Sequence, residues 1–112
     1  MAIEITSRHM HVSPDIQEYV RQSIERLIEH FPRVEHVHVI LDHEKHLSIA
    51  EVVVQAKNHI RVEAKKSSKN IRMSFDDAAN KVEKQLRRLR DKAQSHKVRK
   101  NAEIKGKKGS SI

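Results

Sequence analysis

The chain has 112 residues, of which 37% are hydrophobic and 34% charged, and this composition suits one small domain with a modest core. The absence of Cys excludes disulfides and thiolate metal sites, and no apolar run is long enough for a signal peptide or a membrane span. The net charge of +8 is concentrated late in the sequence, because residues 81–108 hold 12 Lys and Arg against three acids and so carry +9.

Two elements are predicted in the first third of the sequence. Residues 2–8 alternate apolar and polar side chains, which is typical of a half-buried strand. The segment 13–15, Ser-Pro-Asp, then predicts a helix start with an N-cap, a Pro at the first helical position and an acid in the first turn. An apolar face follows at helical spacing, formed by Ile16, Val20, Ile24, Leu27, Ile28 and Phe31. The helix has to end before Pro32, which disfavours helical geometry in the residue ahead of it.

Three further strands are predicted in the middle of the sequence, at residues 37–41, 51–57 and 60–65. Each is apolar on one side only, so the sheet should have one face on a core and one face in water. Asn58 and His59 suit a tight hairpin turn, and a second turn is expected within residues 43–48. A polar loop is expected over residues 65–70.

The last predicted element is a long helix. Ser74 to Asp77 fits the Ser-x-x-Asp capping pattern, while a start one turn earlier, near Ile71, stays open. Its apolar stripe consists of Phe75, Ala78, Ala79, Val82, Leu86, Leu89 and Ala93. The periodicity fails near His96, so residues 96–112 are expected to form a disordered basic tail.

These elements predict an α+β fold of order β-α-β-β-β-α. Two helices packed on one face of a four-stranded sheet are the economical arrangement for such an order. We expect one domain over residues 1–95, followed by the basic tail over residues 96–112.

The basic residues of the second helix fall into a row. At about 100° per residue, one row contains Lys81, Lys84, Arg88 and Lys92. The row lies about a third of a turn from the apolar stripe, so it stays exposed when the stripe is buried. We interpret it as a nucleic-acid contact; an ordinary solvated helix face is the alternative. Arg87 differs, because Glu83 and Asp91 lie four residues to either side and can neutralise it.

Several mechanisms are not expected from this sequence. With one Tyr, no Trp and both Phe on predicted apolar faces, recognition should run through phosphates and sugar hydroxyls rather than base stacking. The pairs His9-x-His11 and His36-x-His38 have a chelating spacing, yet no carboxylate obviously converges on them, so no metal or other cofactor is expected. The sequence has no Gly-rich phosphate loop and no nucleophile motif, so neither enzyme activity nor a small-molecule substrate is expected.

The first predicted strand and helix resemble the opening signature of a bacterial family in the segment ITSRHMHVSPDIQEYV, residues 5–20. The family is that of the ribosome hibernation-promoting factors, also called ribosome-associated inhibitors or sigma-54 modulation proteins. The second helix is similar to the family's Asp…Asp-Lys-Leu-Glu-Arg-Gln-Leu-Arg-Lys run at Asp76 and residues 81–88. Together with Glu51 and Val52, the resemblance covers residues 2–95.

The resemblance implies a translation inhibitor that occupies the messenger and transfer RNA channel of the small ribosomal subunit under stress or in stationary phase. It implies a cytoplasmic protein, monomeric in isolation, with the small subunit and its rRNA as partners. The cations that it places on rRNA are Lys81, Lys84, Arg87 and Arg88, with Arg8 and Arg26 as weaker matches.

Two departures from the family are visible. Arg72 stands where the family usually has an aromatic residue, and the dimerisation domain of long family members is not expected in a chain of this length. Two other functions stay open: a generic binder of structured RNA, and a transcription modulator that acts on a sigma factor.

Overall fold

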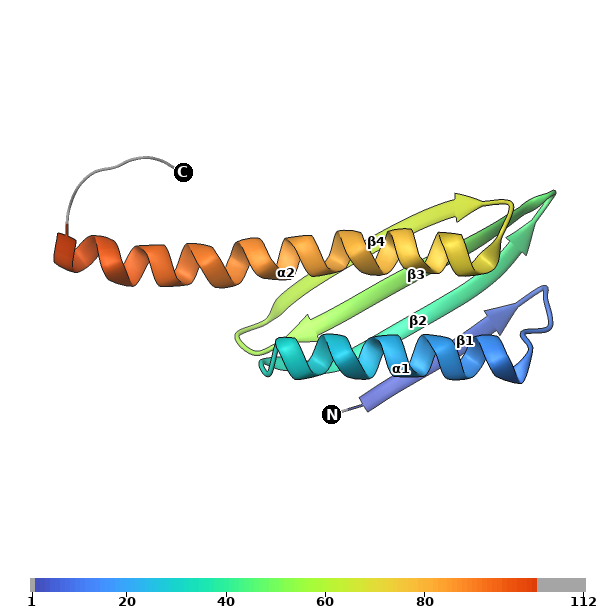
Figure 1. Cartoon of the computed structure of the whole chain (residues 1–112), viewed down its shortest axis with the longest axis horizontal. Helices are drawn as coiled ribbons and strands as arrows, with labels where there is room; N and C mark the ends of the chain where they lie inside the picture. The colour runs from blue at the N-terminus through green and yellow to red at the C-terminus, as the bar shows by residue number, and fades with distance from the viewer. Residues whose placement is uncertain (1, 103–112) are drawn as a thin grey trace.

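The computed structural model describes residues 2–102, and the side chains of residues 2–91. The elements are β1 (Ala2–Arg8), α1 (Pro14–His30), β2 (Val34–Glu44), β3 (Leu47–Ala56), β4 (Ile60–Ser68) and α2 (Ile71–Ala102). The strands lie in the order β1-β2-β3-β4, with β1 parallel to β2 and the other neighbours antiparallel. Both helices lie on one face of the sheet (Figure 1), which confirms the predicted α+β fold.

The core lies between the helices and the inner face of the sheet. Alternate residues of β2 and β3 are buried, and their neighbours on the outer face are half-buried or exposed, as predicted. The largest fully buried side chains include Phe75, Ile24, Leu41, Val20, Val37, Val39, Val52, Val54 and Val82. Residues from α1, α2 and the three longer strands therefore share one core.

The ends of α1 are those that its sequence predicts. The Ser13 hydroxyl accepts a hydrogen bond of 3.3 Å from the backbone N–H of Ile16, which caps the first turn. At the other end, the backbone N–H of Phe31 donates to the carbonyls of Leu27 and Ile28. The helix ends one residue before Phe31 and two before Pro32.

Tight turns join the three antiparallel strands. Three residues, 57–59, join the paired residues Ala56 and Ile60, and Asn58 and His59 among them have left-handed φ values of 67° and 61°, so the predicted hairpin is confirmed. The β2–β3 connection occupies residues 45 and 46, within the predicted turn. β4 is longer than predicted, because Ser68 pairs with Ser48 of β3 and the ladder continues through residues 65–68. The expected polar loop is thus reduced to Lys69 and Asn70.

Two starts were open for α2, one with Ser74 as the cap and one a turn earlier, near Ile71. Asn70 caps the helix, since its side-chain oxygen accepts from the backbone N–H groups of Arg72 at 2.8 Å and Met73 at 3.3 Å. The start near Ile71 is therefore confirmed, and Ser74 as a cap is wrong. Ser74 is fully buried instead, and its hydroxyl donates to the backbone carbonyl of Ser48 at 2.7 Å.

The C-terminal half of α2 extends past the sheet (Figure 1). The apolar stripe is buried as far as Leu86, but Leu89 is 39% exposed because the helix leaves the body there. α2 continues to Ala102, so residues 96–102 are helical where a disordered tail was expected. Four of these seven residues, Lys97, Arg99, Lys100 and Ala102, are good helix formers, and such residues need no apolar face to be helical. The remainder of the predicted tail, residues 103–112, lies outside the described residues. Among the described helices, none is long and apolar enough to cross a membrane.

Candidate nucleic-acid interface

The helix α2 presents its basic row beside strand β4. Phe75, Val82 and Leu86 hold the helix on the sheet, and the Gln85 side-chain amide donates to the backbone carbonyl of Glu63 in β4 at 3.4 Å. Helical geometry places Lys81 next to Gln85 on the exposed β4 side, and the row continues from there along the helix. The sheet thus fixes which side of α2 faces solvent.

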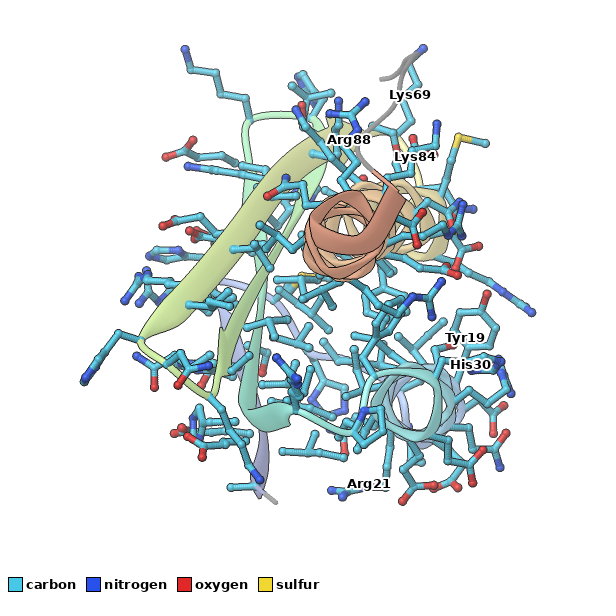
Figure 2. All side chains as sticks on the ribbon, turned by 90° about the vertical axis from the view of Figure 1, so that its left-hand side faces the viewer. Tyr19, Arg21, His30, Lys69, Lys84 and Arg88 are labelled. Atoms are coloured by element: carbon cyan, nitrogen blue, oxygen red, sulfur yellow. The ribbon has the colours of Figure 1, made fainter. Side chains whose placement is uncertain are left out.

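Lys81, Lys84 and Arg88 are all exposed, and none forms an ion pair with any residue from 2 to 91. Figure 2 shows Lys84 and Arg88 on one side of α2 together with Lys69, away from Tyr19 on α1. Their charges are therefore available to an anion. Lys69 belongs to the short loop before α2, and it was expected only as part of a polar loop and not as a site residue.

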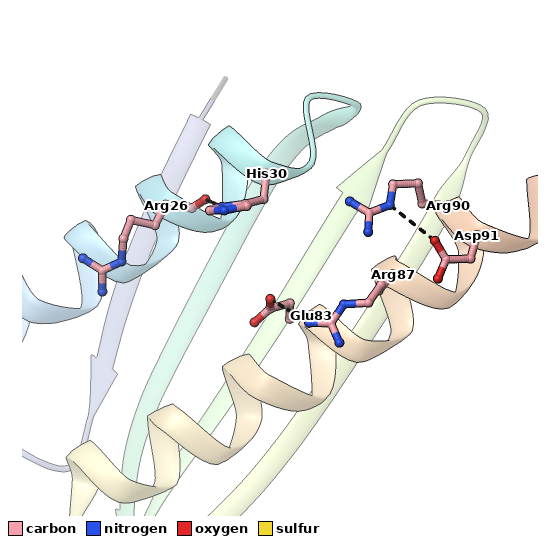
Figure 3. A network of polar contacts seen from close by, with 6 residues as sticks. All are labelled: Arg26, His30, Glu83, Arg87, Arg90 and Asp91. Carbon is pink, nitrogen blue, oxygen red and sulfur yellow. Dashed lines mark hydrogen bonds and ion pairs between the residues drawn. The ribbon is translucent and has the colours of Figure 1, made fainter. Parts of the chain in front are cut away.

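Arg87 lies on the flank of α2 that faces α1, and its charge is engaged. Its Nη2 atom is 3.0 Å from the Oε2 atom of Glu83, so the predicted neutralisation by Glu83 is confirmed. Asp91 pairs with Arg90 instead, with 3.6 Å between Arg90 Nε and Asp91 Oδ1. Figure 3 shows these pairs beside Arg26 and His30 of α1. The arginines on this flank are paired with acidic side chains, whereas the described cations of the row on the β4 side have no acidic partner among residues 2–91.

A third engaged arginine lies near the start of α2. The Arg72 guanidinium is 4.1 Å from the centre of the Tyr19 ring, a distance suited to a cation–π interaction. The Tyr19 ring also meets Phe75 edge-on, with 6.1 Å between the ring centroids. Arg72 therefore packs on an aromatic ring of α1 at the position where an aromatic residue was expected from the family.

Arg26 is the predicted site residue that lies on α1. Its Nη2 atom donates a long hydrogen bond of 3.4 Å to the Ser23 hydroxyl, and the side chain is exposed. Its backbone carbonyl accepts a hydrogen bond from His30 Nδ1 at 2.8 Å. Arg26 thus adds one exposed charge to the α1 side of the helical layer.

Two predicted site residues are not brought to the row. Arg8 pairs in register with Asp42 of β2, a position on the outer face of the sheet, while α2 packs on the inner face. Lys92 belongs to α2, but its side chain lies outside those that the structure describes.

Asp42 is the centre of a separate polar cluster at the end of β2. His9 Nδ1 lies 3.0 Å from Asp42 Oδ1, and the backbone N–H of His43 donates to the same oxygen at 2.7 Å. The hydrogen bond with His9, followed by that from His43, holds the pKa of Asp42 below its ordinary value of 3.8. The cluster contributes to the local structure of the sheet end.

Both histidines of the pair His36-x-His38 contact side chains of the neighbouring strand β1. His38 Nε2 is 2.9 Å from the Thr6 hydroxyl, and His36 Nε2 is 3.9 Å from Glu4 Oε1. Within the described part of the chain, no three His, Cys, Asp or Glu side chains gather as metal ligands would.

The chain is similar to proteins of one bacterial family. A family model described as Sigma 54 modulation protein / S30EA ribosomal protein matches residues 3–94. The chain is 27% identical over 95 residues to a ribosome hibernation promoting factor of Pseudomonas putida, covering 85% of this chain and 92% of that protein. It is 25% identical over 96 residues to a ribosome hibernation promoting factor of Salmonella typhimurium, covering 86% of this chain and all of that protein (100%).

Solved structures share the fold. A ribosomal subunit interface protein from Coxiella burnetii superposes with a TM-score of 0.75 at 21% identity, covering 81% of this chain and 99% of that one. The Protein Y N-terminal domain of Thermus thermophilus superposes with a TM-score of 0.70 at 22% identity, covering 80% of this chain and 99% of that one.

Proposed function

The chain belongs to the Sigma 54 modulation protein / S30EA ribosomal protein family, and we propose that it is a ribosome hibernation factor that inhibits translation. In this proposal, the protein binds the small ribosomal subunit in the cytoplasm and occupies the channel for messenger and transfer RNA under stress or in stationary phase. The names of the relatives from Pseudomonas putida and Salmonella typhimurium support the role in hibernation. The observation that carries the contact is the uncompensated row Lys81, Lys84 and Arg88.

The row is suited to several phosphates at once. Its members lie three and four residues apart on one helix, so they span about 10 Å along the helix axis at 1.5 Å per residue. Residues 71–86 of this helix are fixed on the sheet by buried side chains, which keeps Lys81 and Lys84 facing solvent, and Arg88 follows about one turn after Lys84 on the same helix. A fixed line of cations complements a folded RNA backbone, and each phosphate contact releases condensed counterions.

The aromatic residues favour contact with the backbone of the RNA over contact with its bases. Phe31 and Phe75 are 7% and 1% exposed, and Tyr19 is occupied by Arg72 and Asp76. None of these rings is free to stack on a base. Recognition through phosphates and 2′-hydroxyls suits folded rRNA, whose shape rather than sequence is read.

The other predicted site residues take different places in the proposal. Lys92 follows Arg88 by one turn on α2 and extends the row. Arg87 and Arg26 form a second group on the side of the helical layer between α1 and α2. Arg8 lies on the opposite face of the sheet, so it contacts rRNA only if the channel surrounds the domain.

Inhibition in this proposal follows from occupancy and needs no catalysis. A single chain that fills the channel excludes initiator transfer RNA and messenger RNA by overlap. Purified protein should therefore displace labelled initiator transfer RNA from small subunits, and it should block initiation in a translation reaction at about one molecule per ribosome. Inhibition by far less than one molecule per ribosome, or simultaneous binding with transfer RNA, would contradict the proposal.

A generic binder of structured RNA is the alternative that the same basic row favours. Equal affinity for small subunits and for an unrelated RNA duplex at the same salt concentration would select this alternative. A sigma-factor modulator, a role that the family's description also names, would instead give a protein complex that survives nuclease and high salt.

A further inference from the structure

We propose that the ion pair with Glu83 keeps Arg87 from contacting the phosphates of RNA of arbitrary shape. Such RNA then contacts only the row on the β4 side of α2. The charge of Arg87 stays paired with Glu83 on the α1 side of the helix. Only a ligand that contacts both sides of α2 brings a phosphate close enough to Arg87 to take the place of Glu83. The proposal rests on the proposed function, since it assigns to Glu83 the regulation of the same RNA-binding surface.

The pair is well placed for this role. Arg87 Nη2 and Glu83 Oε2 are 3.0 Å apart and come from residues four apart on one helix, with Glu on the N-terminal side, the favourable order. Both side chains are 40–49% exposed, so the pair is reachable from solvent and weak enough for a phosphate to displace it. A buried pair could not be opened in this way at low cost.

The same flank engages its other arginines too. Arg90 lies 3.6 Å from Asp91 and 5.2 Å from the centre of the Phe31 ring, and Arg72 lies over the Tyr19 ring. All three described arginines on this flank have a partner, as Figure 3 shows for Arg87 and Arg90. The helix thus carries uncompensated cations on one side and compensated cations on the other.

This asymmetry predicts a difference between two kinds of RNA. A duplex of arbitrary sequence binds the row and gains little by opening the Glu83–Arg87 pair, so Arg87 adds no phosphate contact. A folded rRNA surface that faces both sides of α2 brings a phosphate to Arg87 and replaces Glu83. Removing the Glu83 charge should therefore add a phosphate contact in the complex with the duplex. In the complex with folded rRNA it should only remove the weak competition between Glu83 and the phosphate for Arg87.

The test uses Glu83→Gln with Glu25→Gln as the control. Glu25 is exposed on α1 and forms no ion pair among residues 2–91, so both variants remove one acid from the helical layer. Affinity is measured over a salt series for a short RNA duplex of arbitrary sequence and for purified small subunits. The same measurements on Arg87→Gln and on the double variant show whether Glu83 acts through Arg87.

We expect Glu83→Gln to bind the duplex about threefold more tightly at low salt, with a log–log salt slope steeper by about 0.9. On small subunits the gain should be about twofold, with an unchanged slope, because the number of phosphate contacts is the same. In the Arg87→Gln background, Glu83→Gln should behave like Glu25→Gln. Circular dichroism melting checks that each variant is folded.

Two results would overturn the inference. The first is a duplex slope that Glu83→Gln leaves unchanged; the second is a gain that persists in full without Arg87, which would make Glu83 an ordinary long-range charge. The measurement of binding to the RNA duplex needs no ribosomes and can be interpreted by itself. Failure of the wild-type protein to bind small subunits would therefore remove the proposed function while the duplex cycle still decides the role of Glu83.

Discussion

The hydroxyl of Tyr19 on α1 donates a hydrogen bond of 2.6 Å to Asp76 Oδ1 on α2. The two residues are 57 positions apart in the sequence, and they connect the two helices above the sheet. The guanidinium of Arg72 covers the same Tyr19 ring at 4.1 Å, so one aromatic side chain serves both contacts. The orientation of α2, and with it the direction of the basic row, depends in part on this connection.

Tyr19→Phe should therefore destabilise the domain while leaving its core intact. A hydrogen bond to a charged, half-buried carboxylate contributes about 1–2 kcal/mol to the free energy of unfolding. For a domain of this size the melting temperature should fall by about 4–8 °C per kcal/mol, measured by circular dichroism. If Tyr19→Phe and Asp76→Asn act through the same bond, the double variant should be no less stable than the worse single variant. Fully additive losses would show that the two side chains act separately.

The cluster at Asp42 predicts a pH dependence of stability. Because the folded-state pKa of Asp42 is below its ordinary value of 3.8, the charged carboxylate stabilises the fold above that pH. This stability is lost as the pH falls through the lower, folded-state pKa. Asp42→Asn should thus melt at a lower temperature than wild type at neutral pH, and the difference should shrink below pH 3.8.

His9→Ala supplies the matched comparison for Asp42, since the His9 ring is the first cause of the lowered pKa. It should reproduce part of the loss in the same pH range. A difference between wild type and Asp42→Asn that stays constant from neutral to strongly acid pH would show that the charge of Asp42 has no part in it.

The basic row predicts a specific salt dependence. Changing Lys81, Lys84 and Arg88 to Glu should remove three phosphate contacts, which lowers the log–log slope of binding to small subunits by about 2–3. The melting temperature should change little, because all three side chains are exposed and unpaired within residues 2–91.

A second triple variant controls for net charge. Changing Arg33, Lys45 and Lys57 to Glu alters the net charge by the same amount at exposed positions outside α2. It should bind more weakly through long-range repulsion but keep most of the wild-type slope. Equal slopes for the two variants would mean that the row is an ordinary solvated helix face.

Elements whose ends depend on local hydrogen bonds could be predicted from the sequence. α1 is one, because the cap at Ser13 and the stop at Pro32 lie within its own segment. The turn at Asn58 and His59 is another, since these residue types tolerate positive φ. The basic row could also be predicted, because helical periodicity alone relates its members to the apolar stripe.

Features that depend on distant partners could not be predicted. Ser74 matches a capping pattern, but the carbonyl of Ser48, 26 residues away, takes its hydroxyl into the core. Likewise, the extra length of β4 comes from pairing with β3, which residues 65–68 alone do not indicate. Arg8 was grouped with the cations of α2, and the parallel pairing of β1 with β2 puts it across the sheet from them.

If the uncompensated row on α2 attaches this protein to ribosomes, the attachment should be visible by sedimentation of lysates from starved cells. Lysates from cells that express wild type or the Lys81, Lys84 and Arg88 to Glu variant are separated on sucrose gradients and blotted for the protein. Wild type should sediment with particles that contain the small subunit, and the triple variant should stay at the ribosome-free top at equal abundance. Wild type at the top of the gradient, or a triple variant that sediments with ribosomes as wild type does, would show that the row does not attach the protein to ribosomes.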